Sequence, residues 1–283
     1  MTGKLVLIGT PLGNREDLSP RARRALAEAD LLLCEDTRSP QRLLGLSGTG
    51  DEIQLPERIS CFVGNEHERL GLLRERLAAG QTVAFVSEAG LPVWSDPGRF
   101  LVAAAVEVGF EVDVIPGPTA ATCALALSGF VAERARFYGF LPRGGAERDA
   151  VLAELAREPG AALIYEAGNR VPALLRDLVA GSGERAIVIV REYSKLHQEV
   201  LRGRVGELAE QIREPLRGEV TLVLAGFERL DDQARVDAPI EAARAVLEIM
   251  LDASLKPRAR AKALAELTGL DARALYERLS GAR

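Results

Sequence analysis

The chain is poor in several residue types that mark common functional classes. Its 283 residues include three cysteines, Cys34, Cys61 and Cys123, which are scattered and follow no metal-binding spacing. An odd number of scattered cysteines is typical of incidental thiols in a reducing cytoplasm rather than of a disulfide framework. His67 and His197 are the only histidines, so a zinc site or a Ser-His-Asp triad is poorly supplied. We therefore expect no metal site.

Long apolar runs and aromatic residues are also scarce. No run of eighteen apolar residues is present, so we expect no membrane-spanning helix. The first residues lack the features of a signal peptide, and we expect a cytoplasmic protein. An aromatic content of 5% argues against a stacking platform for single-stranded RNA. For Trp94, a packed core position is favoured over stacking on a base.

The charge is acidic overall but uneven. A net charge of −5 does not suggest a protein coated with nucleic acid. From residue 254 to residue 283, however, the sequence has seven Lys or Arg residues and only three acidic residues. Such a basic tail is either a local phosphate-binding patch or the solvated face of a helix.

The residues that are abundant indicate an α/β fold. Hydrophobic residues make up 47% of the chain and charged residues 27%, as in a globular protein with a proper core. Up to residue 129, short apolar strands such as LVLIG and QTVAFV alternate with amphipathic helices, which predicts a parallel sheet covered by helices. We interpret residues 130–143 as a crossover. A second set of strands and helices then runs to the segment EVTLVLAGF.

This pattern predicts three parts. We expect a first α/β domain over residues 1–129, a second over 130–229 and a small helical domain over 240–283. Residues 228–240 are polar and predict a linker.

Four loops that follow predicted strands are rich in glycine, proline and charged residues. They are 9-GTPLGN-14, 35-EDTR-38, 87-SEAGLPVWSDPG-98 and 116-PGPTAA-121. None carries the dinucleotide fingerprint or the phosphate-binding P-loop pattern. A single loop of this kind is a weak signal, since tight turns use the same residues. Four of them at one sheet edge favour a ligand site, because ligands bind outside the carboxyl ends of parallel strands.

In their order along the chain, these loops and later motifs resemble those of a known family. The set is GTPLGN, CEDTR, SEAGLPVWSDPG, IPGPTAA, FYGFLP, IYEAGNR, REYSK and RGEVTLVLAG. It resembles the tetrapyrrole methylase superfamily and, within it, the ribosomal RNA small subunit methyltransferase I family. The resemblance covers about residues 4–227, and the tail is similar to the small helical domain of that family.

The resemblance implies a fold, a cofactor and an acceptor. It implies S-adenosylmethionine bound between two α/β domains and methyl transfer to the ribose 2′-hydroxyl of a cytidine in small-subunit (16S) ribosomal RNA. It also implies a homodimer. The implied cofactor-binding residues are Pro11, Leu12, Glu88, Ala89, Gly90, Leu91, Thr119, Ala120, Leu141, Leu224 and Gly226.

Methyl transfer to a hydroxyl also needs a group that takes the proton or steadies the alkoxide. Candidates for this role are Glu35, Asp36, Glu66, Glu166, Glu192 and Lys195. Guanidinium groups match phosphates well, so Arg38, Arg170 and Arg191 are candidates for holding RNA. For each of these residues the alternative is an interdomain ion pair. Our predicted catalytic set is Glu35, Arg38, Glu66, Arg170, Glu192 and Lys195.

Two other functions stay open at this point. Glu88 and Leu91 stand where the family typically has Asp and Thr, and Asn169 stands at a histidine position. The chain is then either a paralogue that methylates a tetrapyrrole or another small acceptor, or a silent relative that binds cofactor or RNA. Binding of S-adenosylmethionine without transfer to RNA would favour these alternatives.

Overall fold

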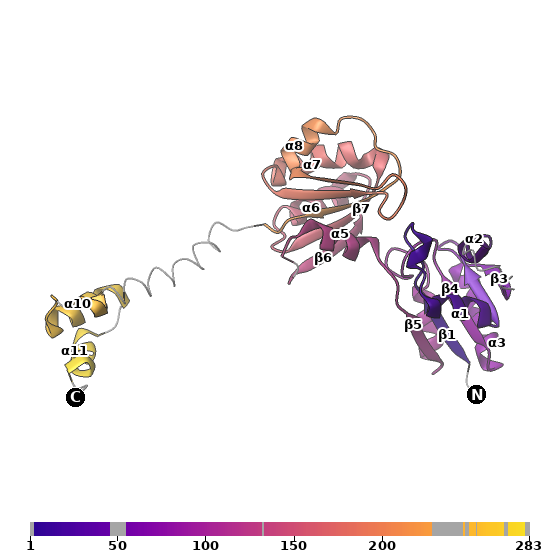
Figure 1. Ribbon diagram of the computed structural model, residues 1–283, viewed down its shortest axis with the longest axis horizontal. Helices are drawn as coiled ribbons and strands as arrows, with labels where there is room; N and C mark the ends of the chain where they lie inside the picture. Colours follow the sequence, from indigo (N-terminus) through magenta and orange to yellow (C-terminus); the bar gives the residue numbers. More distant parts are fainter. Residues whose placement is uncertain are drawn as a thin grey trace. The chain divides into compact units, whose positions relative to one another are not determined.

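A computed structural model describes residues 3–45, 55–131, 133–227, 246, 249–252, 254–268 and 271–280. The chain divides into two compact units, Met1–Phe227 and Glu228–Arg283 (Figure 1). The predicted linker over residues 228–240 lies outside the described residues, as does most of the start of the predicted helical domain, up to residue 248. In the second unit the structure describes α10 (Pro257–Thr268) and α11 (Ala272–Ser280), which pack against each other.

The first sheet of the larger unit is entirely parallel. Its strand order is β3-β2-β4-β1-β5. The strands are β1 (Lys4–Ile8), β2 (Leu31–Cys34), β3 (Glu57–Ser60), β4 (Thr82–Val86) and β5 (Glu111–Ile115). Their carboxyl ends therefore lie at the same edge, and the four glycine-rich and charged loops follow β1, β2, β4 and β5.

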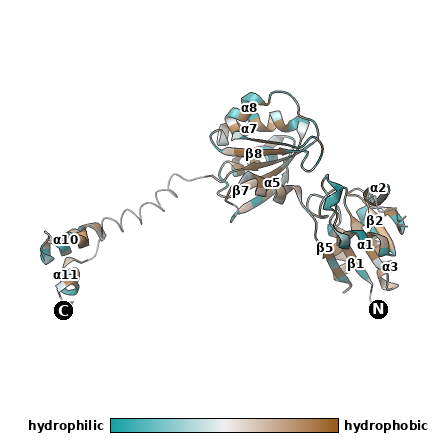
Figure 2. Ribbon diagram, viewed as in Figure 1, coloured by the Kyte–Doolittle hydropathy of each residue, from teal (hydrophilic) through white to brown (hydrophobic). Residues whose placement is uncertain are grey.

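Helices cover both faces of this sheet. α1 (Pro20–Glu28) and α2 (Ser39–Gly45) pack on one face, while α3 (Glu66–Ala78) and α4 (Arg99–Glu107) pack on the other. Local chemistry sets the start of α1, where Ser19 accepts the N–H of Ala22 and Pro20 occupies the first turn. Figure 2 shows the strands as mostly apolar and the helices as mixed in hydropathy, as burial on one side requires.

The second sheet is mixed. Its order is β6-β7-β10-β8-β9, with β6 parallel to β7 and the remaining neighbours antiparallel. The strands are β6 (Ala135–Phe140), β7 (Ala161–Ala167), β8 (Ala186–Arg191), β9 (Glu199–Arg204) and β10 (Glu219–Leu224). One face packs against α6 (Gly145–Leu155), α7 (Val171–Ser182) and α8 (Val205–Gln211). Two short 3-10 turns, Arg15–Asp17 and Gly168–Arg170, complete the unit.

The opposite face of the second sheet is covered by α5 (Ala120–Ser128). This helix follows β5 of the first sheet, yet Ala121 and Ala124 pack on strands of the second sheet. Its small residues let the helix approach the sheet closely, and the Tyr165 hydroxyl accepts the N–H of Ala121 at 3.1 Å. This helix therefore joins the two sheets in two ways: it follows the first sheet in the chain, and it packs against the second.

The second sheet also differs from expectation. The segment 130–143, interpreted as a crossover, contains the edge strand β6. The strand at the other edge, β9, was not predicted from the sequence. Both edge strands are more exposed than the central strands, so they lack the continuous apolar run of a buried strand. Within the described part of the chain, no helix is long and apolar enough to cross a membrane.

Glu66 has a structural role in the first sheet's helix layer. The residue is 4% exposed, and its carboxylate accepts the N–H groups of Gly98, Phe100 and Leu101 at 3.0, 2.8 and 3.2 Å. These are donors at the start of α4, which Gly98 itself leaves without a side-chain cap.

We predict that Glu66→Ala lowers the free energy of unfolding by about 2 kcal/mol, because it leaves buried N–H groups unsatisfied. Glu66→Gln keeps one acceptor oxygen and should lose less. Urea denaturation followed by circular dichroism measures both. Glu75→Ala, on the exposed face of α3, is the control and should change little. Equal stabilities for Glu66→Ala and Glu75→Ala would contradict this role.

Candidate active site

Three of the four loops are tied together at the carboxyl edge of the first sheet. The Thr10 N–H donates to the Gly90 carbonyl at 2.9 Å, and the Leu91 N–H donates to the Pro118 carbonyl at 3.0 Å. Gly9 and Gly117 touch through backbone, since a Cβ on Gly9 would lie 2.5 Å from the Gly117 Cα. These loops therefore form one continuous backbone surface, as expected for a ligand site at this edge.

A cavity of about 410 Å³ lies against this surface. Its other wall comes from the second sheet, through the ends of β6, β7 and β8 and the start of β10. This volume is in the range of sites for small molecules, and an interdomain cleft is a common place for them.

The structure brings together seven of the eleven predicted cofactor-binding residues at this cavity. They are Leu12, Glu88, Ala89, Gly90, Leu91, Thr119 and Ala120. The other four, Pro11, Leu141, Leu224 and Gly226, are not among the lining residues. Leu141 and Leu224 lie in the buried core under α6 and α7, on the other face of the second sheet. A Cβ on Gly226 would lie 2.3 Å from the Pro159 carbonyl oxygen, so the chain leaves no room for a side chain at this position.

The cavity wall is acidic. Glu88, Asp96, Glu166, Glu192 and Glu219 line it, and Lys195 is the cation among the lining residues. Glu166 is almost fully buried, and its Oε2 has no hydrogen-bond partner within the described part of the chain. Carboxylates attract positive charge and only accept hydrogen bonds, so this wall suits a ligand that carries positive charge and donates hydrogen bonds.

Two predicted catalytic residues, Glu192 and Lys195, lie on the cavity wall and bind each other. The Lys195 ammonium contacts Glu192 Oε1 at 3.0 Å and Glu219 Oε2 at 2.9 Å. Burial works to lower the pKa of Lys195, but the hydrogen bonds to the two carboxylates outweigh it and hold the pKa above its ordinary value. Lys195 therefore stays charged and is a cation for this site rather than a base.

Glu192 is held firmly in place. Burial acts to raise its pKa, but the Glu219 N–H and Lys195 donate to it and bring the pKa below its ordinary value. Its backbone φ is +48°, and the adjacent Gly218, at φ +86°, leaves no room for a side chain because a Cβ would lie 2.4 Å from Glu192 Oε1. Glu192 is thus a weak base that orients Lys195.

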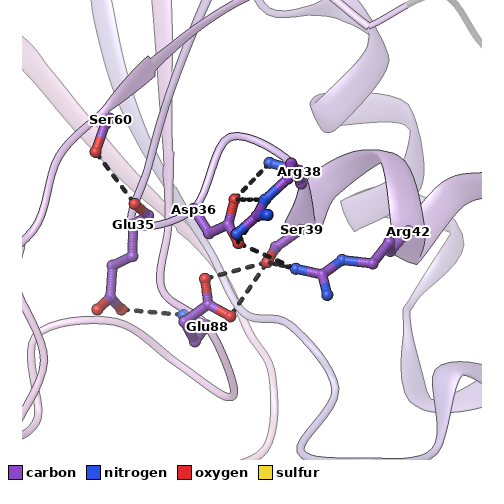
Figure 3. Close-up of polar contacts among 7 residues, drawn as sticks. All are labelled: Glu35, Asp36, Arg38, Ser39, Arg42, Ser60 and Glu88. Carbon is purple, nitrogen blue, oxygen red and sulfur yellow. Dashed lines mark hydrogen bonds and ion pairs between the residues drawn. The ribbon is translucent and has the colours of Figure 1, made fainter.

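Glu35 and Glu88 lie together at the end of β2 and β4 (Figure 3). Glu35 Oε1 accepts the N–H of Glu88 at 3.0 Å, and the Ser39 hydroxyl is 3.1 Å from both carboxylate oxygens of Glu88. Burial raises the pKa of Glu35. Glu35 does not line the cavity but holds the backbone of the loop that does.

The predicted arginines form ion pairs beside the site. Arg38 forms a bidentate ion pair with Asp36 (Figure 3). Its hydrogen bonds lower the pKa of Asp36 to about 2. The Arg38 side chain itself is exposed. Arg170 Nε lies 3.3 Å from Glu166 Oε1, next to the cavity. Arg191 pairs with Glu199 at 2.9 Å. Glu66 caps α4 and, like Arg38 and Arg170, is not among the lining residues.

The predicted site set omitted several residues that line the cavity, including Asp96, Trp94, Tyr165 and Phe140. Burial raises the pKa of Asp96, and the nearby charge of Glu219 adds to this effect. Asp96 shares a loop with Glu88, so its place in SDPG was the available signal. Trp94, expected in the core, is 42% exposed at the cavity. Phe140 lies in the motif FYGFLP, but that segment was interpreted as a crossover, so its place on an edge strand beside the cavity was not predicted.

The loop after β4 also holds unusual backbone conformations. Val93 and Ser95 have φ of +85° and +66°, values that cost roughly 1–3 kcal/mol each for residues with a side chain. Such conformations persist where the surroundings enforce them and cluster at functional sites.

Metal and thiol chemistry find no support in the described part of the chain. It holds no group of three His, Cys, Asp or Glu side chains placed to bind a metal ion. Cys34, Cys61 and Cys123 are free thiols, and burial raises the pKa of Cys34 and Cys61 to about 12. Neither buried thiol is a nucleophile near neutral pH.

Comparison with known proteins defines the class. The family model for Tetrapyrrole (Corrin/Porphyrin) Methylases matches residues 4–209. Among solved structures, the chain is similar to uroporphyrin-III C-methyl transferase from Thermus thermophilus, complexed with S-adenyl homocysteine, at a TM-score of 0.56 and 23% identity. That similarity covers 79% of this chain and 97% of the other. The predicted fold, two α/β domains of the tetrapyrrole methylase type with C-terminal helices, is confirmed.

Curated relatives narrow the class to a family. The chain is 42% identical to the ribosomal RNA small subunit methyltransferase I of Thermotoga maritima, over 80% of this chain and 100% of that protein. It is 33% identical to the protein of the same name from Streptococcus pyogenes serotype M1, over 98% of this chain and 94% of the relative. The chain belongs to the ribosomal RNA small subunit methyltransferase I family, which confirms the predicted membership.

We predict opposite pH effects for two aspartates. Burial raises the folded-state pKa of Asp96, so its contribution to stability is lost as pH rises through that value. Asp96→Asn should therefore gain stability over wild type as pH increases from about 4, the ordinary value for Asp. The hydrogen bond from Lys4 lowers the pKa of Asp113, so Asp113→Asn should lose stability at pH 7 and recover as pH falls below about 4.

Melting temperatures of both variants and wild type between pH 3 and about 8 measure these differences. Asp113 lies on β5 and does not line the cavity, so the pair compares one cavity carboxylate with one paired surface carboxylate. The same pH dependence for both variants would contradict the assignment of burial as the cause at Asp96.

Proposed function

We propose that this protein transfers a methyl group from S-adenosylmethionine to the 2′-hydroxyl of a cytidine in small-subunit (16S) ribosomal RNA. The observation that carries the proposal is the acidic cavity between the loops of the first sheet and the second sheet, in a chain 42% identical to a ribosomal RNA small subunit methyltransferase I. Seven residues that the family resemblance assigns to the cofactor line that cavity.

The cavity fits the cofactor chemically. When bound, S-adenosylmethionine supplies a methyl group activated by a positively charged sulfonium. The five lining carboxylates complement that charge, and carboxylate oxygens accept hydrogen bonds from an amine or a ribose hydroxyl. Backbone groups of Glu88 to Leu91 and the start of α5 would hold the ligand, with Thr119 as the helix N-cap.

Asp96 is the lining residue suited to take the proton from the acceptor hydroxyl. Its pKa is raised by burial, which makes it a stronger base than an ordinary carboxylate. Lys195 stays protonated and is placed to steady negative charge on the acceptor oxygen, while Glu192 orients its ammonium. Glu35 fixes the loop that carries Glu88 and so acts through position rather than contact.

Arginines outside the cavity would meet the RNA. Arg170 lies beside the lining residue Glu166, and Arg38 is exposed near the end of β2. Guanidinium groups beside the cavity would hold phosphates of the RNA strand while one nucleotide enters the cavity. The basic tail, with Lys256, Arg258 and Arg260 in or next to α10, is a second candidate surface for phosphate.

The remaining parts of the proposal concern where the protein acts and in what state. Small ribosomal subunits are cytoplasmic in bacteria, so the proposed acceptor places the activity in the cytoplasm. A homodimer is part of the same proposal and rests on the family resemblance. Light scattering of the purified protein measures the mass and tests it.

The function is tested with labelled S-adenosylmethionine and small ribosomal subunits from cells that lack this activity. We expect a single labelled 2′-O-methylcytidine after digestion and mapping of the RNA. Gly90→Ala should lower both cofactor affinity and transfer by about tenfold, because Gly90 has φ +83° and a Cβ would lie 3.0 Å from the Pro118 carbonyl oxygen.

Gly109→Ala is the matched control for this variant. Gly109 has φ +81° but no atom within 4 Å of an added Cβ, and it does not line the cavity. It should carry the same backbone strain without loss of cofactor affinity, which calorimetry measures. Cofactor binding without any transfer to RNA would sink the proposed acceptor and favour a tetrapyrrole or other small molecule.

A further prediction concerns the proton. Asp96→Asn should lower kcat by about a hundredfold or more, while the Kd for S-adenosylmethionine changes little. Wild-type kcat should fall as pH drops through the raised pKa of Asp96. Asp113→Asn is the control and should keep full activity. An unchanged kcat in Asp96→Asn would remove Asp96 from this role.

A further inference from the structure

Two aromatic side chains that line the cavity are largely exposed to solvent. Trp94, in the loop after β4, is 42% exposed, and Phe140, at the end of β6, is 60% exposed. Both line the cavity, one from each sheet. Exposed aromatic rings lose hydrophobic stabilisation, so their position at a cavity calls for a ligand that covers them.

The backbone around Trp94 is bent to place it there. Val93 and Ser95, the residues on either side, both have positive φ. This conformation is rare for any residue with a side chain and most unfavourable for a β-branched one such as valine. A hydrogen bond from the Val93 N–H to the Pro97 carbonyl at 3.2 Å closes the turn. The loop thus holds Trp94 out of the core in which a tryptophan is usually packed.

The backbone before Phe140 is irregular too. The pairing of β6 with β7 shifts between Phe137 and Gly139, which has φ +64°. The shift inserts one extra residue between them; in a regular strand Phe137 and Phe140, three positions apart, would point to opposite faces because side chains alternate. With the extra residue, Phe137 pairs beside Leu163 and Phe140 beside Tyr165, on one face of the sheet.

The two irregular segments meet, and aromatic contacts link them. A Cβ on Gly139 would lie 3.3 Å from Ser95 Oγ. Ring centroids are 4.4 Å apart for Trp94 and Phe137, 5.0 Å for Phe137 and Tyr165, and 5.7 Å for Phe140 and Tyr165. Tyr165 is fixed in turn, because its hydroxyl accepts the Ala121 N–H. The exposed rings are therefore held from behind.

We propose that Trp94 and Phe140 bind the base of the acceptor nucleotide by stacking at the rim of the cavity. The proposal rests on the proposed function for the identity of that base. A single nucleotide of a polymer must turn out of its strand to bring its ribose hydroxyl inside, and an unstacked base then needs aromatic partners. Stacking also suits this acidic wall, because a neutral base approaches carboxylates more easily than a phosphate does.

Steady-state kinetics test the assignment. At saturating S-adenosylmethionine, Trp94→Leu and Phe140→Leu should each raise KM for small ribosomal subunits by about tenfold and leave the Kd for the cofactor unchanged. Trp94→Phe and Phe140→Tyr keep a ring and should retain most of the affinity. Phe62→Leu is the matched control, since Phe62 is 45% exposed but does not line the cavity.

A second measurement needs no methyl transfer. Trp94 is the only tryptophan of the chain, so intrinsic fluorescence reports on it alone. With S-adenosylhomocysteine saturating, cytidine 5′-monophosphate should quench the emission, whereas ribose 5-phosphate, which has the same sugar and phosphate but no base, should not. Phe140→Leu should weaken the quenching and Phe62→Leu should leave it unchanged.

Three results would overturn the assignment. If Trp94→Leu and Phe140→Leu lost affinity for S-adenosylhomocysteine while KM for subunits stayed unchanged, the rings would bind the adenine of the cofactor instead. Equal quenching by ribose 5-phosphate, or an equal rise of KM in Phe62→Leu, would exclude specific stacking. Absence of transfer by the wild-type protein is a failure of the proposed function instead, and the fluorescence titration still decides whether the rings bind a base.

Discussion

The parallel pairing of β3, β2, β4, β1 and β5 is the constraint on which the rest of the structure depends. It places every strand's carboxyl end at one edge, so loops separated by up to about a hundred residues share backbone hydrogen bonds there. The contact between Gly9 and Gly117 is possible only because neither carries a Cβ. α5 then leaves this edge and packs on the second sheet, which closes the cavity.

The features that could be predicted from the sequence were those that depend on residues close together in the chain. Apolar runs such as that of Leu31 to Cys34 identified the buried strands, and ordered motifs identified the family, which the relatives confirm. The edge strands β6 and β9 were not predicted, because their exposed residues do not form an apolar run. Residues at the cavity were predictable where backbone motifs carry them, as at Gly90. Side-chain roles were not, because capping by Glu66 depends on donors more than thirty residues away.

In the larger unit, negatively charged side chains line the cavity and arginines lie outside it. Five carboxylates and Lys195 line the interior, which favours a cationic ligand and disfavours phosphate. Arg170 and Arg38 lie outside it, already paired with acids. The proposed RNA acceptor would therefore find guanidinium groups around the cavity and carboxylates within it. For the proposed acceptor, such an arrangement would admit a ribose and its base and keep the polyanionic backbone outside.

The position of β10 has a consequence for how the chain is made. β10 is the last strand of the larger unit, yet it lies in the middle of its sheet, between β7 and β8. During synthesis, the first sheet has all its strands once Ile115 has emerged, whereas β7 and β8 lack their shared neighbour until Leu224. A nascent chain that ends earlier exposes unpaired strand edges, which are templates for aggregation. The cavity wall contributed by residues 218–221 is therefore completed last, so no ligand can be enclosed before the sheet itself is whole.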